Sequence, residues 1–144
     1  MLDPAIELGT STPKADPSGD YAFALFGKAE AVKTGAKATL EAKALTLSGG
    51  PASVSPPTGR NLYAWVMETG KADIFLTYCT NALLAKADVP SLSIVAIPKP
   101  LNVAADYGLV IMNGAPKAAH DLAAFIHSET GRAALIKYGF SEGD

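Results

Sequence analysis

Residues 8–22, LGTSTPKADPSGDYA, decide the fold because they contain a strand, a loop and the start of a helix. Residues 7–10 predict a short extended segment, and the prolines and glycine after it are typical of a shaped loop. Asp16 is a suitable N-cap and Pro17 a suitable first helical residue, and the apolar residues that follow recur at helical spacing. The stretch therefore predicts one unit of strand, loop and helix, with the helix starting near residue 17.

Strands and helices continue to alternate beyond this unit. Residues 62–69 give the clearest helix, which stops at Gly70, a natural C-cap. Residues 73–78 form a nearly continuous run of β-prone residues, as in a strand buried on both faces. We also predict strands at 45–48, 91–97 and 107–112, and helices at 36–44, 80–87, from 116 and from 128 to 139. This alternation predicts an α/β fold with a mostly parallel sheet flanked by helices.

Size and charge exclude several classes of protein. The chain has 144 residues, of which 49% are hydrophobic, enough to bury one ordinary core. Charged residues make up 18% and the formal net charge is -2, so no broad positive field attracts nucleic acid or an anionic membrane. The apolar runs are shorter than the roughly 20 residues of a membrane-spanning helix. Residues 1–4 show no secretory signal, and we expect any export signal to lie outside this chain.

Three places could offer hydrogen-bond donors to a ligand. Ser18 and Gly19 occupy the first turn of the first helix, where unpaired backbone N–H groups attract anions. Arg60 begins a later helix, where a cation is reasonable if an anion binds beside it. Tyr78 ends a predicted strand, at the sheet edge where α/β folds bind ligands. Simpler interpretations stay open for each: a capped helix, a solvated arginine and a tyrosine packed on the core.

Catalytic chemistry has less support in the sequence. His120 and His127 are seven residues apart on one predicted helix, too far to share a metal without another ligand. Cys79 is the single cysteine, which excludes a disulfide within the chain, and no basic neighbour in sequence activates it. The phosphate-binding, dinucleotide-binding and nucleophile-elbow motifs are absent. We therefore expect no enzymatic activity, no cofactor and no metal site.

Several segments, in order, resemble the molybdate-binding periplasmic proteins of ABC importers, which have the type II periplasmic binding fold. These segments are residues 8–22, the helix ending METG at 67–70, the run DIFLTYCTNA at 73–82, and the last two helices, which finish in KYGF at 137–140. The resemblance spans nearly the whole chain.

The resemblance implies a tetrahedral oxyanion held between two lobes by neutral donors. Carried onto this sequence, the donors are the backbone N–H of Ser18 in its turn with Gly19, the backbone N–H of Arg60 and the hydroxyl of Tyr78. Asn81 stands where the family usually has an aspartate, and Arg60 adds a charge, so tungstate and sulfate stay beside molybdate as expected ligands. The resemblance also implies an ABC permease as partner and a periplasmic location.

The same resemblance divides the chain. Residues 3–97 would form the second lobe, 98–105 the interlobe connection, and 106–144 a strand-helix-helix segment belonging to the first lobe. The N-terminal lobe, which supplies two serine-type donors in the family, has no counterpart here. The C-terminal segment would leave an apolar face uncovered, so we expect a homodimer through it. The alternative function is the effector-binding domain of a LysR-type transcription regulator, which has the same fold.

Overall fold

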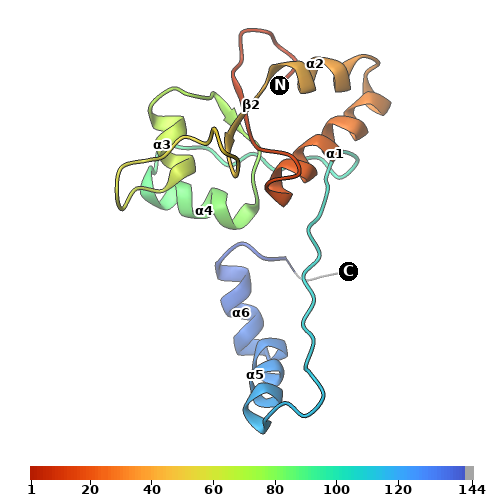
Figure 1. Ribbon diagram of the computed structural model, residues 1–144, viewed down its shortest axis with the longest axis vertical. Helices are drawn as coiled ribbons and strands as arrows, with labels where there is room; N and C mark the ends of the chain where they lie inside the picture. The colour runs from red at the N-terminus through yellow and green to blue at the C-terminus, as the bar shows by residue number, and fades with distance from the viewer. Residues whose placement is uncertain (142–144) are drawn as a thin grey trace. The chain divides into compact units, whose positions relative to one another are not determined.

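The computed structural model describes residues 1–141 and divides the chain into two compact units, Met1–Ala104 and Ala105–Asp144. In the first unit, strands and helices alternate along the chain (Figure 1). They are β1 (Leu8–Ser11), α1 (Pro17–Val32), α2 (Ala36–Lys43), β2 (Ala44–Ser48), α3 (Leu62–Glu68), β3 (Ile74–Phe75) and α4 (Cys79–Asp88).

The strands of the first unit form a parallel sheet in the order β2-β1-β3. Leu8 of β1 pairs with Ala44 on one side and with Ile74 on the other. Parallel strands need a crossover connection, which α1 and α2 supply between β1 and β2, and α3 supplies between β2 and β3. The prediction of an α/β fold with a parallel sheet flanked by helices is therefore confirmed.

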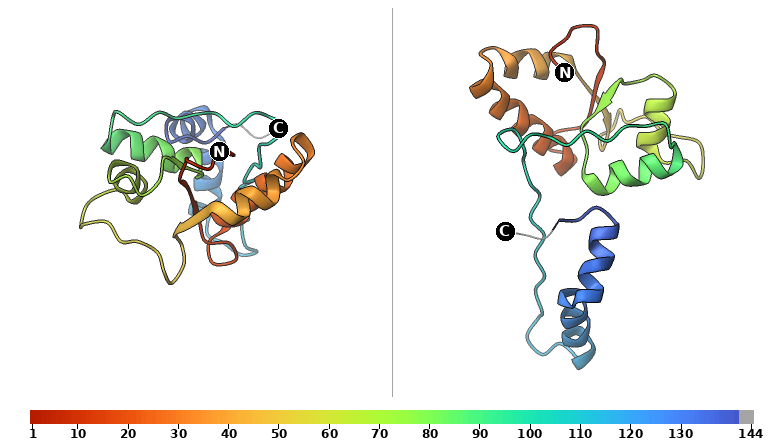
Figure 2. Two further views of the ribbon diagram at one scale, coloured as in Figure 1. Left: turned by 90° about the horizontal axis from the view of Figure 1, so that it is seen from above. Right: turned by 180° about the vertical axis from the view of Figure 1, so that it is seen from behind.

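Neighbouring residues of β1 face opposite sides of this sheet. Leu8 is fully buried in an apolar core with side chains of α1 and α2, including Phe26. On the other side, a Cβ on Gly9 would lie 2.7 Å from the ring of Phe75. Phe75 in turn contacts Tyr63 of α3, edge to face, with ring centroids 5.0 Å apart. The helices α1 and α2 thus cover one face and α3 the other, as the views in Figure 2 also show.

Carboxylate side chains cap the starts of both α1 and α2. Asp16 caps the start of α1 as predicted, because its side chain accepts a hydrogen bond from the backbone N–H of Ser18 at 3.0 Å. Near the other end of α1, the carboxylate of Glu30 accepts from the backbone N–H groups of Gly35 and Lys37, at 2.9 and 3.0 Å. These two hydrogen bonds lower the pKa of Glu30. The N-cap of α2 is Gly35, which has no side chain to accept these hydrogen bonds, so Glu30 takes the place of a capping side chain for α2.

The second unit contains the helices α5 (Lys117–His127) and α6 (Glu129–Lys137). Ser128 ends α5 and caps α6, where its hydroxyl accepts from the backbone N–H of Gly131 at 3.1 Å. An apolar hollow of about 240 Å³ is lined by Phe125, Ile126, Gly131, Ala134, Leu135, Tyr138 and Phe140. Large apolar side chains of this unit remain exposed, Tyr107, Val110, Met112, Leu122 and Phe125 among them. The unit therefore buries few of its apolar side chains by itself.

Two predicted strands are wrong. Residues 91–97 and 107–112 pair with no strand within residues 1–141, and β3 covers only two residues of the predicted run 73–78. Both segments have β-prone compositions, but a strand forms only where a neighbouring strand offers hydrogen-bond partners. Without such a neighbour Val95 and Val110 are 83% and 85% exposed. Within residues 106–141 the C-terminal segment therefore has an irregular stretch and two helices, in place of the predicted strand, helix and helix.

Candidate functional site

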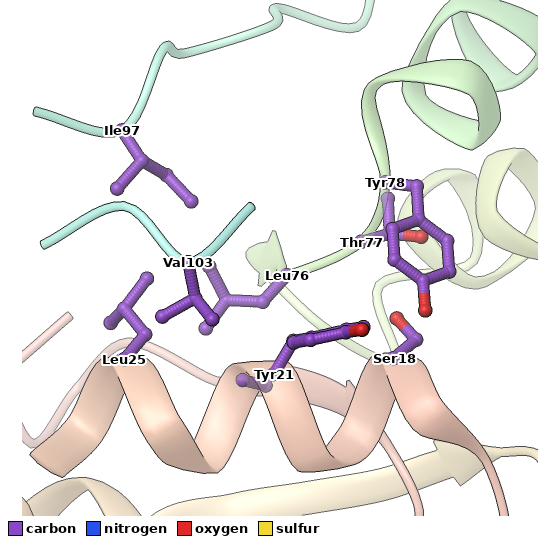
Figure 3. Close-up of a pocket in the computed structure, with 9 residues that line it drawn as sticks. Ser18, Tyr21, Leu25, Leu76, Thr77, Tyr78, Ile97 and Val103 are labelled. Carbon is purple, nitrogen blue, oxygen red and sulfur yellow. The ribbon is translucent and has the colours of Figure 1, made fainter. Parts of the chain in front are cut away.

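A pocket of about 50 Å³ in the first unit lies between the start of α1 and the chain that follows β3 (Figure 3). Its polar lining residues are Ser18, Tyr21, Thr77 and Tyr78, and its apolar ones are Ala22, Leu25, Leu76, Ile97 and Val103. None of these side chains is charged. A ligand in this pocket would therefore meet hydroxyl groups and apolar surface, not ions.

Hydroxyl groups gather at one end of the pocket. Ser18 and Tyr21 lie one turn apart on the same face of α1. Tyr78 is the N-cap of α4, and its ring packs edge to face against Tyr21 with centroids 6.0 Å apart. In Figure 3 the hydroxyl groups of Ser18 and Tyr78 point toward one another, and the aliphatic side chains line the other end. The structure thus brings together two of the predicted ligand residues from separate elements.

The backbone donors at the start of α1 are already in use. The N–H of Ser18 donates to the Asp16 carboxylate, and the N–H of Gly19 donates to the Asp16 carbonyl at 2.9 Å. Gly19 also has a packing role, because a Cβ there would lie 2.6 Å from backbone atoms of Thr12 and Pro13. Its lack of a side chain lets the loop close onto the helix. Ser18 therefore presents its hydroxyl to the pocket, while its N–H holds the cap together.

Like Gly19, Arg60 is a predicted ligand residue that does not line this pocket. Its guanidinium donates to Glu68 at 2.6 Å and to Asp88 at 3.2 Å, and both carboxylates raise its pKa. Its backbone N–H donates to the carbonyl of Pro57 at 3.1 Å. Arg60 therefore ties the start of α3 to the ends of α3 and α4, and two carboxylates already compensate its charge.

Sequence reasoning missed Tyr21, Thr77 and the contacts of Asn81. The amide nitrogen of Asn81 donates to the hydroxyl oxygens of Thr77 and Tyr63, each at 3.0 Å. Tyr21 could have been found, because its spacing of three residues from Ser18 puts both on one helix face. Thr77 gave no such signal. A strand reaching residue 78 would turn residues 77 and 78 to opposite faces, whereas β3 ends at residue 75 and both line the pocket.

The remaining candidate residues do not line this pocket. Cys79 is exposed, and His120 and His127 both belong to α5. Across residues 1–141, no three side chains of His, Cys, Asp or Glu come together as a metal-binding group. In the same range, no helix combines the length and the apolar character that crossing a membrane requires.

Comparison with known proteins gives the family. The sequence profile of the family described as bacterial extracellular solute-binding protein matches residues 1–141. An uncharacterized protein of Pasteurella multocida (strain Pm70) is 41% identical over 111 residues, which are 76% of this chain and 45% of that protein. The chain thus spans less than half of that relative's length. No solved structure matches this chain significantly. Because the family profile covers almost the whole sequence, the chain belongs to the family of bacterial extracellular solute-binding proteins.

Proposed function

We propose that this chain is the solute-binding component of an ABC importer and that its solute is a small tetrahedral oxyanion such as molybdate, tungstate or sulfate. Membership of the solute-binding family supports the transport role. The observation that carries the anion assignment is the set of hydroxyl groups from Ser18, Tyr21, Thr77 and Tyr78 in a pocket lined by no carboxylate. Hydroxyl groups donate hydrogen bonds to oxyanions, and such charge-assisted bonds are roughly twice as strong as neutral ones.

Neutral donors suffice for an anion when they are already in place. The ring of Tyr78 rests against Tyr21, and Asn81 holds the hydroxyl of Thr77. Donors that are ordered before the ligand arrives lose less conformational freedom on binding. The aliphatic end of the pocket lowers the local dielectric, which strengthens hydrogen bonds to a charged solute. We therefore assign the ligand shell of this unit to Ser18, Tyr21, Thr77 and Tyr78, and leave Arg60 outside it.

The lobe assignment is part of the same proposal. Residues 3–97 form the second lobe, residues 98–105 connect the lobes, and residues 106–144 return to the first lobe. Since the chain spans 45% of its relative's length, a first lobe would add further donors to the anion. The partners under this proposal are an ABC permease and, through the C-terminal segment, a second copy of the chain. The family's extracellular role supports a periplasmic location and favours solute binding over the effector domain of a transcription regulator.

Isothermal titration of the full chain with molybdate, tungstate and sulfate tests this function. At least one anion should give saturable heat. Tyr78→Phe removes one hydroxyl from the pocket and should weaken binding about tenfold, the usual effect of losing a hydrogen bond to a charged group. Tyr107→Phe is the matched control, because Tyr107 is an exposed residue of the second unit. No saturable heat with any of the three anions, or equal affinity for both tyrosine variants, would contradict the proposal.

A further inference from the structure

The hydroxyl of Thr77 has one hydrogen-bond partner, Asn81, and the Thr77 proton takes no part in that bond. The amide nitrogen Nδ2 of Asn81 lies 3.0 Å from Thr77 Oγ1. An amide nitrogen only donates, so Thr77 is the acceptor in this pair. Within residues 1–141 the structure gives the Thr77 hydroxyl no second protein partner. Its O–H therefore remains available for a group outside the protein.

Asn81 is held in this orientation by three elements. It lies in the first turn of α4, and the same Nδ2 donates to the hydroxyl of Tyr63 on α3, also at 3.0 Å. The ring of Tyr63 is in turn fixed against Phe75 of β3. The amide nitrogen of Asn81 therefore donates to two hydroxyl oxygens and occupies one acceptor site of Thr77 Oγ1, so the Thr77 O–H must point away from Asn81.

We infer that Thr77 is a ligand-binding residue and that Asn81 is the positioning residue that directs its proton into the pocket. The inference rests on the proposed function. Thr77 lines the pocket together with Ser18 and Tyr78, so its proton adds a donor to their hydroxyl groups. A donor at this position requires an acceptor on the solute. The unprotonated, charged oxygens of a fully ionised oxyanion are the strongest acceptors for such a donor, so Thr77 favours a solute of this kind.

The first test compares two variants of Thr77 by titrating molybdate into the full chain. Thr77→Val keeps the shape of the side chain but removes its hydroxyl. The Kd should rise about ten- to a hundredfold, because a hydrogen bond to a charged solute is lost. Thr77→Ser keeps the hydroxyl and should stay within about threefold of the parent chain, a difference well under 1 kcal/mol. Circular dichroism verifies that each variant is folded.

The second test addresses Asn81 with a variant of the same shape. The carboxylate in Asn81→Asp can only accept, so it would take the Thr77 proton away from the solute. Asn81→Asp should therefore weaken molybdate binding by a larger factor in the parent chain than in the Thr77→Val chain, where no such proton exists.

Each outcome has a separate meaning. Equal factors in the two backgrounds would overturn the positioning role of Asn81 and leave only the effect of its new charge. An unchanged Kd in Thr77→Val, with the parent chain binding molybdate, would overturn the ligand role of Thr77. No binding by the parent chain would overturn the proposed function and this inference together.

Discussion

Replacing Gly19 with alanine tests whether the loop before α1 packs as closely as the structure describes. A Cβ at this position would lie 2.6 Å from backbone atoms of Thr12 and Pro13, and 2.7 Å from the carbonyl oxygen of Ser11. Gly19 has no positive φ, so alanine meets no backbone strain there and can destabilise the fold only through the contacts of its methyl group. Backbone atoms cannot rotate aside as a side chain can. The loop must shift instead, and overpacking of this kind costs about 1–3 kcal/mol.

Gly27 provides a matched control in the same helix. A Cβ on Gly27 would have nothing within 4 Å outside its own helix backbone. Alanine there gains helix propensity, which should raise the free energy of unfolding by about 0.5–1 kcal/mol. Because alanine gains helix propensity at both positions of α1, the two variants should differ in stability by the steric cost at Gly19, about 1–3 kcal/mol.

Urea unfolding followed by the fluorescence of Trp65, the single tryptophan, measures this difference in the first unit. Since the urea dependence of small proteins is about 1–3 kcal/mol per molar, the midpoints should lie on the order of 1 M apart. A Gly19→Ala chain as stable as Gly27→Ala would refute the close packing of the loop. It would also remove the reason for the position of Ser18 beside Tyr78.

Three further predictions concern the rest of the chain. Thr10 is fully buried, and its hydroxyl has no hydrogen-bond partner within residues 1–141. The isosteric Thr10→Val should therefore raise the free energy of unfolding, measured in urea, by about 1 kcal/mol. A loss of stability would show that the hydroxyl is bonded. Because the folded-state pKa of Glu30 is lowered, its carboxylate stabilises the fold fully above its ordinary value of 4.5, and this stabilisation is lost as the pH falls through the lower folded value. Glu30→Gln should therefore lower the Tm at pH 7 and approach the parent Tm in acid, whereas a constant gap in thermal melts would argue against the cap. Light scattering should give twice the chain mass if the C-terminal segment forms a homodimer, and a monodisperse monomer would contradict that expectation.

Local signals in the sequence predicted the elements that depend on neighbouring residues. Asp16 and Pro17 fixed the start of α1, because an N-cap acts within one turn. Gly70 correctly marked the end of α3, which stops at residue 68. The two elements are predictable because their hydrogen bonds close within a few residues.

Features that depend on distant residues were not predictable in the same way. The two wrong strands have suitable compositions, but pairing needs a free edge elsewhere in the fold. The sequence predicted Arg60 at the start of a helix, where an anion would suit it, yet α3 begins at Leu62, and only the fold shows that Glu68 and Asp88 reach the guanidinium of Arg60. The bond from Asn81 to Thr77 likewise depends on where β3 ends. Single residues at the site thus follow from tertiary structure, even where the family and fold class follow from sequence.

The measurement that tests the account most directly is a titration of the isotopically labelled chain with molybdate, followed by the backbone amide signals in NMR. We expect the signals of Ser18, Thr77 and Tyr78 to shift together with one saturable Kd, because these residues line the pocket. The signals of Arg60 and Tyr107 should stay unchanged. Saturable shifts centred on Arg60, or no shift at any of the three pocket residues, would contradict the assignment of this pocket as the solute site.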